Sequence, residues 1–581
     1  MPFQVSPGIN VSEIDLTTVV PNVATSIGAI AGGFQWGPVL ERTSITTEND
    51  LVKVFGKPND DTAEWFLTAA NYLAYSNNLI VARNVGTSAK NAVVGDTDAG
   101  TAANVNNATD YDSDTFTDQL FVAKYPGALG NSLKAIVVDS VGWATFEAIA
   151  LGARTADQAA IIANFDRAPG TSTDVGNAGG SLDEMHVLVI DEGGLWTGTP
   201  GEVLEKHAFV SKASDAKRID GSSNYIGNVL RNESSYIWLG LVTQLTETTI
   251  DSNTHAGQPK ANTTFNRING ASQSLQMPGG SLTLGVDDNI LLDGELQAGY
   301  ALFTTPEVVD VTLVMGGPAS TTTGKWIIDN ITSVRKDCIA LVSPAKASVV
   351  NAGTGQVAAL TVDNTALGSS SYAVMDGAWK YQYDRYNDVF RYVPMNGDIA
   401  GLCARTDFTN DAWWSPAGLN RGGIKNIVKL SWEATKADRD TLYPLCVNPL
   451  VTQRGTGVVL WGDKTMQTVP SAFDRINVRR LFIVLEKAIS IAAKAMLFEF
   501  NDEFTRSQFV NMVEPFLREI QGRRGITDFK VVCDSSNNTG EVIDTNNFVG
   551  DIYIKPARSI NFIQLNFIAA RSDVSFSEIG G

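Results

Sequence analysis

Ser26–Gly33 reads SIGAIAGG, an apolar run that ends in glycines and predicts a buried β-strand. Helical periodicity follows over Thr62–Tyr75, where large apolar side chains recur at helical spacing. LIVARNV at Leu79–Val85 then predicts a second strand. A strand, a helix and a strand in this order favour an α/β domain, but the pattern stops after this point.

The same pattern resumes after about residue 302. Val308–Met315 (VVDVTLVM) predicts a strand, Thr323–Val334 predicts a helix, and Cys338–Val342 predicts another strand. We therefore expect one split α/β core domain, made of residues 23–85 and 303–460.

Residues 86–302, which interrupt the core, have a different character. They are rich in Gly, Ala, Thr, Asn, Asp and Ser, and their hydrophobic runs are short and separated by turn residues. This pattern predicts one or two β-rich inserted domains. Insertions of this kind are tolerated where they leave from loop tips.

The two ends of the chain complete the predicted organisation. Residues 1–22 resemble an extended arm whose apolar residues have no nearby strand to pair with, and a lone strand is not stable by itself; these residues are Ile9, Val11, Ile14, Val19 and Val20. Residues 461–581 alternate helices with strands and are expected to form a C-terminal domain that donates or accepts strands; the predicted helices are 474–500 and 503–520 and the predicted strands 529–533, 548–554 and 560–569. The fold class is therefore α/β (α+β) and multi-domain, with extended terminal arms.

Charge is unevenly distributed along the 581 residues, whose net charge is −19. Residues 401–530 hold 18 Lys and Arg against 14 Asp and Glu, whereas residues 1–400 hold 23 against 43. The basic part of one copy could face acidic parts of other copies, although it could also be ordinary surface. The acidic total argues against nucleic-acid binding, which needs Lys and Arg to replace phosphate counterions.

No targeting or membrane signal is evident. The N-terminus lacks a basic region followed by an apolar one, and the most apolar run, Leu481–Phe500, is broken by Glu486, Lys487 and Lys494. We therefore expect no membrane insertion. Four scattered cysteines without a CxxC pair indicate buried thiols in a reducing compartment.

The motifs that could carry catalysis are incomplete. Gly457–Thr465 nearly forms a phosphate-binding loop, but Asp463 separates Gly462 from Lys464. Asp110, Asp112 and Asp114 imitate the start of a calcium loop whose later ligands are missing, so a weak ion site stays open as an alternative to a solvated acidic loop.

The three histidines, His186, His207 and His255, lack zinc-ligand spacing. A Ser-His-Asp arrangement that forms in space is not excluded by sequence, so a tail-associated hydrolase within the insertion is a minor alternative. We expect no enzyme activity, no catalytic residue, no cofactor and no metal.

Interaction chemistry is better represented. Trp379–Arg391 (WKYQYDRYNDVFR) and the pair Trp413 and Trp414 combine the residue types that dominate protein interfaces, although each could be buried in the subunit's own core. Arginines are the second feature. If residues 474–482 are helical, Arg475, Arg479 and Arg480 share roughly one face and could meet an acidic partner. The alternative is that they form an ion-pair network within the chain. The arginines expected to face other subunits or a tube are Arg475, Arg479, Arg480, Arg518, Arg523 and Arg524.

Several blocks in order along the chain resemble the contractile-tail sheath proteins of large tailed bacteriophages. They cover about residues 1–85 and 300–581, and none lies in 86–300; they are SPGI (6–9), FQWGP (34–38), DGAW (376–379), YQYDRYNDVFRYV (381–393), DIAGLCARTD (398–407), SPAGLNRG (415–422), GDKT (462–465), FDRINVRRLF (473–482) and PARSIN (556–561).

The resemblance implies a structural, non-enzymatic subunit. Such subunits form stacked six-membered rings in a helical lattice around a tail tube, with the core facing the tube and the insertion facing outward. Both chain ends add strands to neighbouring subunits, and contraction drives the tube through the host envelope. The implied partners are other copies, the tail tube protein, and the baseplate and tail terminator proteins. The implied location is the virion tail, after assembly in the host cytoplasm. A sheath of a related contractile injection system, either a bacteriocin or a secretion-type system, is the alternative.

Overall fold

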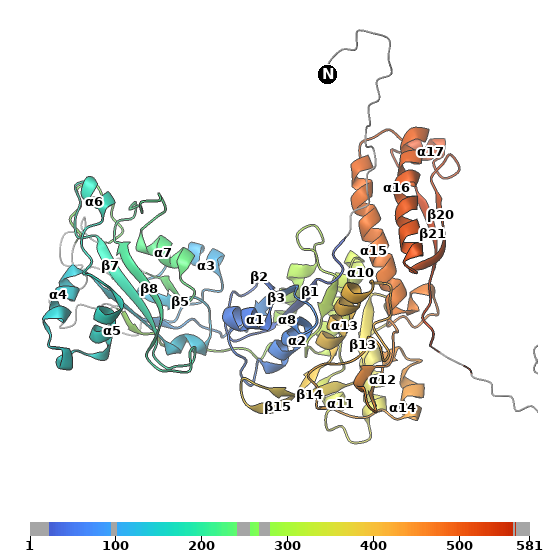
Figure 1. The fold of residues 1–581 in the computed structure, drawn as a ribbon, viewed down its shortest axis with the longest axis horizontal. Helices are drawn as coiled ribbons and strands as arrows, with labels where there is room; N and C mark the ends of the chain where they lie inside the picture. The colour runs from blue at the N-terminus through green and yellow to red at the C-terminus, as the bar shows by residue number, and fades with distance from the viewer. Residues whose placement is uncertain (1–22, 95–100, 241–255, 266–278, 562–563, 565–581) are drawn as a thin grey trace, which may run out of the picture.

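The computed structural model describes residues 23–94, 101–240, 256–265, 279–561 and 564. These residues form three parts along the long axis of the molecule (Figure 1). The insertion lies at one end, the α/β core extends from the middle to the other end, and a C-terminal pair of helices rises from the core at that end. The expectation of a multi-domain α/β chain is confirmed. The expected arm, residues 1–22, lies outside the described residues.

The core is built on a seven-stranded sheet to which both segments of the chain contribute. Its strands are parallel except for β2 at one edge. In spatial order they are β17 (Val447–Asn448), β13 (Ala373–Asp376), β12 (Ile339–Val342), β11 (Leu313–Met315), β1 (Gly28–Gly33), β3 (Leu79–Asn84) and β2 (Arg42–Ile45). Strand β11 is shorter than the eight residues expected from its apolar pattern.

Both faces of this sheet are buried, which explains the continuous apolar runs in its strands. Ile30 faces one hydrophobic cluster, while its neighbours Ala29 and Ala31 face the other, because successive strand residues point to opposite sides. In β12, Leu341 faces the first of these clusters and Val342 faces the second. The helices α1 (Glu48–Phe55), α2 (Ala63–Leu73) and α13 (Asn396–Thr409) supply the first cluster, and α9 (Thr321–Ile327) and α12 (Gln356–Leu367) supply the second.

Smaller elements surround the core sheet. Helix α9 continues as a π-helical turn, Ile328–Thr332, into α10 (Ser333–Arg335). The remaining core elements are α11 (Lys346–Val349), α14 (Lys436–Leu442), the three-stranded sheet of β14 (Trp379–Asp384), β15 (Val389–Pro394) and β16 (Lys429–Leu430), and the hairpin of β18 (Leu450–Gln453) and β19 (Gly457–Leu460).

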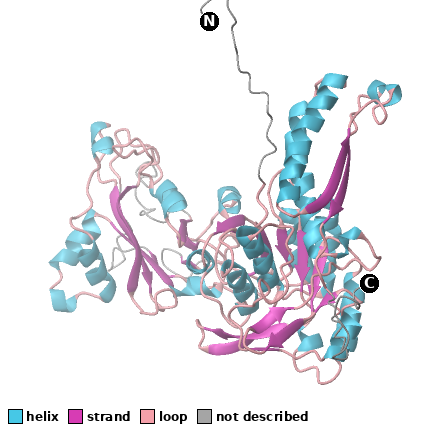
Figure 2. Cartoon of the chain, turned by 45° about the vertical axis from the view of Figure 1, so that its right-hand side comes forward, coloured by secondary structure: helices cyan, strands magenta, loops and turns pink. Residues whose placement is uncertain are grey.

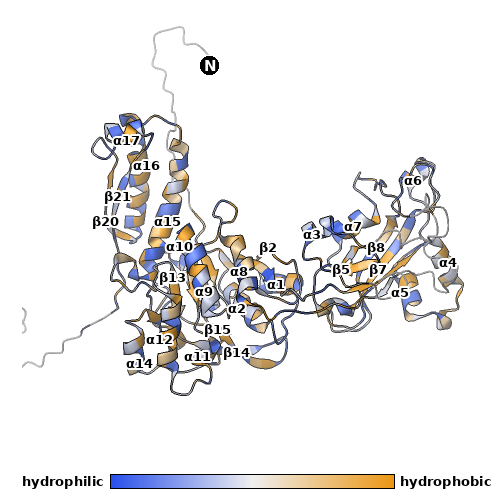
Figure 3. Cartoon of the chain, turned by 180° about the vertical axis from the view of Figure 1, so that it is seen from behind, coloured by the Kyte–Doolittle hydropathy of each residue, from blue (hydrophilic) through white to orange (hydrophobic). Residues whose placement is uncertain are grey.

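The insertion contains two antiparallel sheets and several helices, so it is less purely β than expected. One sheet holds β6 (Leu133–Val138), β7 (Glu184–Asp191), β8 (Glu202–Ser211) and β10 (Gly279–Ser281), and the other holds β4 (Val93–Val94), β5 (Phe121–Ala123) and β9 (Ile237–Leu239). The helices are α3 (Ala108–Ser113), α4 (Ser140–Ala148), α5 (Ala156–Asn164), α6 (Thr173–Asn177) and α7 (Ile226–Glu233). Apolar residues are concentrated in its strands (Figure 3).

The end of the insertion lies earlier than residue 302. Helix α8 (Asp293–Tyr300) packs on β1 and β3 of the core sheet. Its last residue, Tyr300, is fully buried and donates a hydrogen bond of 2.6 Å to the carbonyl of Met315 in β11. By its contacts, α8 therefore belongs to the core.

The FQWGP segment (residues 34–38) joins the core to the insertion. Trp36 packs edge-on against Tyr125 and Trp196 of the insertion. The buried guanidinium of Arg83 donates to the carbonyls of Phe34, Gln35, Gly37 and Pro126, so one side chain ties both parts together.

The C-terminal part pairs two long helices with a two-stranded sheet (Figure 2). Helix α15 spans Ile476–Ala493, helix α16 spans Glu503–Gly522, and α17 spans Gly540–Asp544. Antiparallel strands β20 (Ile526–Val532) and β21 (Asp551–Pro556) pack beside α16. The strand expected at residues 560–569 lies almost wholly outside the described residues.

Candidate assembly interface

The position where open α/β sheets usually bind ligands is filled by protein. Such sites form where the strand order reverses, here beyond the carboxyl ends of β1 and β11. A Cβ atom added to Gly32 would lie 2.2 Å from Cε3 of Trp65, and one added to Gly317 would lie 2.4 Å from its Cζ3. The Trp65 indole therefore occupies the space above both glycines, which leaves no room there for a nucleotide or substrate.

Buried charged groups near this end of the sheet are engaged with one another. Lys380 and Asp398 form an ion pair of 2.9 Å, and Tyr75 donates to the same carboxylate. Burial raises the pKa of Asp376 to about 8, although its contacts with Ser343 and the Ala378 amide oppose this shift. Asp376 lies in β13, Lys380 in β14 and Asp398 in α13, so these buried groups help to hold the three elements together.

The incomplete motifs of the insertion do not form a catalytic or metal site among the described residues. His186 stacks on Phe165 at 4.1 Å, with Nε2 on the carbonyl of Arg167 and Nδ1 accepting from the Phe209 amide. Asp112 pairs with Arg231 instead of joining Asp110 and Asp114 in a calcium loop. No group of three metal-ligating side chains occurs in the described part of the chain, and His255 lies outside it.

A groove of about 1230 Å³ lies between the core and the C-terminal helices. Its walls carry Trp413, Trp414 and Trp461. Five cationic residues line it against the acids Asp440 and Asp463; they are Arg421, Lys436, Arg439, Arg524 and Arg558. We call this feature the tryptophan groove. Aromatic and cationic side chains of this kind are typical of protein-binding surfaces.

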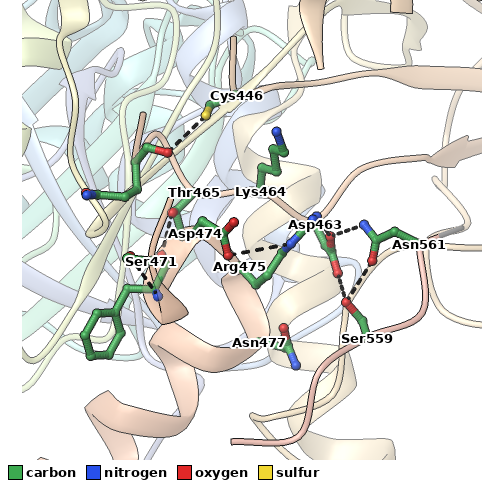
Figure 4. Close-up of polar contacts among 12 residues, drawn as sticks. Cys446, Asp463, Lys464, Thr465, Ser471, Asp474, Arg475, Asn477, Ser559 and Asn561 are labelled. Atoms are coloured by element: carbon green, nitrogen blue, oxygen red, sulfur yellow. Dashed lines mark hydrogen bonds and ion pairs between the residues drawn. The ribbon is translucent and has the colours of Figure 1, made fainter. Parts of the chain in front are cut away.

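Asp463 lines the tryptophan groove, and Figure 4 shows its polar contacts. Its carboxylate accepts hydrogen bonds from Ser559 at 2.7 Å and Asn561 at 3.2 Å and forms an ion pair with Arg475 at 3.0 Å. Burial alone would raise the pKa of Asp463, but these donors together with Ser415 hold it below its ordinary value. Asp463, which interrupts the phosphate-binding motif, therefore holds residues 559–561 in place just after β21.

Arg475, Arg479 and Arg480 make contacts within the subunit. Arg475 contacts Asp463, Arg479 donates to Ser371 and lies 3.9 Å from the Phe473 ring centroid, and Arg480 is buried against Asp407. For these three residues the described contacts match the alternative of an intrachain network. The side chains of Arg479 and Arg480 are buried because this end of α15 lies against the core.

Arg518, Arg523 and Arg524 are exposed near the end of α16. Arg518 has an i,i+4 ion pair with Glu514, Arg523 pairs with Asp411, and Arg524 lies beside Trp414 in the groove wall. Exposed pairs of this kind contribute little to stability. The expected contact of these three arginines with other subunits stays a prediction.

Two further features were missed by sequence reasoning. The β20–β21 sheet has only two strands among the described residues, so both of its outer edges lack a strand partner there. Helix α15 also ends at Ala493, seven residues before its predicted end. The connection to α16 and the first turn of α16 expose four large apolar side chains: Leu497, Phe498, Phe500 and Phe504. The run LFEF was the available signal, but its apolar content made it look like more helix.

No helix in the described ranges is long and apolar enough to cross a membrane.

Three family descriptions match separate parts of the chain. The phage tail sheath protein central domain matches residues 303–466, and the phage tail sheath C-terminal domain matches residues 468–570. The N-terminal region of domain III of the tail sheath protein Gp18 matches residues 25–83. The matches leave the insertion uncovered.

Whole-length relatives agree with these matches. The chain is 35% identical to the tail sheath proteins of Vibrio phage KVP40 and of Enterobacteria phage T4, covering 99% of this chain and 99% of each relative. It is 32% identical to the tail sheath protein of Salmonella phage ViI, covering 99% of this chain and 98% of that one.

Two solved structures share the fold at low sequence identity. A sheath tail protein from Listeria innocua aligns with a TM-score of 0.52 and 13% identity over 92% of this chain and 96% of that one. A sheath tail protein from Desulfitobacterium hafniense aligns with a TM-score of 0.50 and 12% identity over 91% of this chain and 94% of that one. Full-length identity above 30% and the matched sheath domains lead to one conclusion: the chain belongs to the family of phage tail sheath proteins.

Proposed function

We propose that this protein is the structural, non-enzymatic subunit of a contractile phage tail sheath. It polymerises as stacked hexameric rings in a helical lattice around a tail tube, and the lattice shortens to drive the tube through the host envelope. The baseplate proteins lie at one end of the lattice and the tail terminator proteins at the other. The protein functions in the virion tail after assembly in the host cytoplasm.

The observation that carries this proposal is the incomplete sheet at the C-terminal end of the chain. Strands β20 and β21 form only a two-stranded sheet in the described part, and isolated two-stranded sheets are marginally stable. Unpaired backbone donors and acceptors at a strand edge favour addition of another strand. Tyr553 is exposed on this sheet and offers a side-chain contact to an added strand.

The added strands are expected to come from the chain ends of neighbouring copies. In the arm, Ile9 and Val11 share one side of a predicted strand, and residues of this type suit a half-buried sheet position. Ile14, Val19 and Val20 extend the same apolar character toward the core. Main-chain pairing of this kind can persist while subunits rotate, because the flanking segments absorb the movement.

The proposed domain division follows from the strand partners. Residues 23–85 and 303–460 share one sheet, which supports a single split core. Residues 86–302 supply separate sheets, which supports an outer insertion, except that α8 near its end packs on the core. Residues 461–581 supply α15, α16 and the two-stranded sheet, which supports a C-terminal assembly domain. The filled crevice at Trp65 supports a non-enzymatic role.

Electron microscopy of the purified full-length protein, alone and with its tail tube protein, tests this function. We expect ordered tubes from the complete chain and folded, unassembled subunits after removal of residues 1–20. Monodisperse subunits from the complete chain under all conditions would contradict the proposal.

A matched pair of variants tests the arm more finely. Ile9→Lys with Val11→Lys places two charges on the apolar side of the predicted strand and is expected to abolish tubes. Asn10→Lys with Ser12→Lys adds the same charge on the other side and is expected to preserve them. Equal loss in both variants would show that charge, and not strand pairing, is responsible.

A further inference from the structure

The connection between α15 and α16, together with the first turn of α16, carries an exposed apolar surface. We call it the apolar tip and define it by Leu497, Phe498, Phe500 and Phe504. Their side chains are 63%, 104%, 83% and 72% exposed. Phe498 also has φ of +71°, a backbone conformation that large residues avoid. Neither internal packing nor backbone preference explains a fully exposed phenylalanine at this position, and exposed apolar clusters mark interaction sites.

Acidic side chains outnumber basic ones at the apolar tip. Residues 497–504 contain Glu499, Asp502 and Glu503 and no Lys or Arg, and the nearby cation Arg506 is engaged with Asn501. Asp502 caps α16 through the amide of Thr505, which orients its carboxylate at the start of the helix. The tip is therefore both aromatic and acidic.

The tryptophan groove has the complementary character. Trp461 is 43% exposed in its wall, and Ile560 is 82% exposed at its rim. Its lining holds five Lys and Arg against two Asp, and one of these, Asp463, is already engaged by Ser559, Asn561 and Arg475. An acidic aromatic segment matches this lining in charge and in chemistry, and such matching selects partners.

The tip and the groove of one chain lie too far apart to meet. Asn477 at the beginning of α15 lines the groove, whereas the tip follows the end of that helix. Eighteen helical residues separate the two by about 27 Å. A contact between them therefore requires a second copy, and because the two surfaces differ, the contact is head-to-tail and can repeat without closing on itself.

We propose that the apolar tip of one subunit docks in the tryptophan groove of the next. The phenylalanines pack among the groove tryptophans, and the acids face its arginines and lysine. This inference rests on the proposed polymerisation and adds a second contact between copies, one that does not depend on exchange of the terminal arms.

Site-directed crosslinking in assembled tubes tests this contact, because the four native cysteines are buried. The chain with Phe498→Cys and Ile560→Cys is expected to give a ladder of crosslinked oligomers after mild oxidation. The matched control, Phe498→Cys with Leu151→Cys, places the second thiol at an 84% exposed position of the insertion and is expected to give no ladder.

Tubes that form normally but give no ladder would overturn the inference and leave the polymerisation intact. A tip cysteine that crosslinks only to the tube protein, or a groove cysteine that crosslinks only to a neighbour's arm, would also overturn it. Failure of the unmodified chain to form tubes would instead remove the proposed function, and this inference with it.

Charge reversal provides an independent readout. Glu499→Lys with Glu503→Lys, and separately Arg439→Glu with Arg558→Glu, are each expected to reduce the polymerised fraction by about tenfold or more, as loss of central interface contacts does. All four changes in one chain are expected to restore most of the polymer. No restoration, with the folded subunit intact by circular dichroism, would show that the two surfaces do not meet.

Discussion

The core sheet and the C-terminal sheet of this protein differ in how their strands are completed. In the core, seven strands from two distant segments pair within one chain, and helices cover both faces. In the C-terminal part, β20 and β21 pair only with each other among the described residues, and one face has exposed residues. The core thus carries the stability of the subunit, whereas the C-terminal sheet is suited to be completed by another chain.

Substitution of buried and exposed tryptophans offers the strongest test of this contrast. Trp65→Ala should destabilise the subunit by about 3–5 kcal/mol, because it leaves a cavity above Gly32 and Gly317. Trp461→Ala in the groove wall should cost less than about 1 kcal/mol, since much of that side chain is exposed. Urea unfolding followed by tryptophan fluorescence measures both. Similar losses would mean that the groove wall is as tightly packed as the core.

The ion pair that joins α15 to α13 is the next test. Arg480→Met leaves Asp407 buried without its cation, and removal of one partner of a buried pair costs about 3 kcal/mol or more. Arg518→Met, its exposed counterpart on α16, should change stability by less than about 0.5 kcal/mol. Thermal unfolding of the monomers distinguishes them. If the Arg480→Met subunit is stable but fails to assemble, Arg480 contributes to contacts between subunits and not to the stability of the monomer.

An effect of comparable total size, spread over several pH units, should appear in the pH dependence of stability. Burial raises the pKa of Asp376 from 3.8 to about 8, so the folded protein keeps a proton that the unfolded chain releases. Stability should therefore decline as pH rises from about 4 to about 8, by on the order of 1 kcal/mol per pH unit. Asp376→Asn should remove this decline, as measured by urea unfolding at pH 5, 7 and 9.

Asp528 on β20 is the control for that experiment. Its pKa is lowered by a hydrogen bond from Lys555, so any contribution is present at neutral pH and is lost only on acidification through its lowered pKa. Asp528→Asn should leave the slope between pH 5 and 9 unchanged. A changed slope would show that the C-terminal sheet shares the electrostatics of the core.

Local patterns were sufficient to predict most elements of the core. The glycine-ended run at residues 26–33, the periodicity of residues 62–75 and the runs near residues 313 and 339 all correspond to observed strands or helices. Helix ends were less predictable, because the apolar residues after Ala493 continue the composition of α15 although they face solvent.

The roles of individual polar residues were the least predictable part of the candidate site. Arg475, Arg479 and Arg480 share the spacing of a surface patch, yet their partners Asp463, Ser371 and Asp407 lie up to about one hundred residues away in sequence. Asp463 was recognised only as a residue that spoils a motif. Its role as an acceptor depends on residues 559–561, which reach it only after the chain has formed β21.

The sequence by itself determined the α/β class and the family, and it predicted the division by an insertion, because these depend on local apolar periodicity and on motifs in order along the chain. Only the tertiary structure decided that Trp65 fills the crevice of the sheet, that the arginines of α15 point inward, and that an apolar tip and a tryptophan groove lie about a helix length apart. The physical reason is that burial and charge pairing depend on which distant segments meet, and local periodicity carries no information about that.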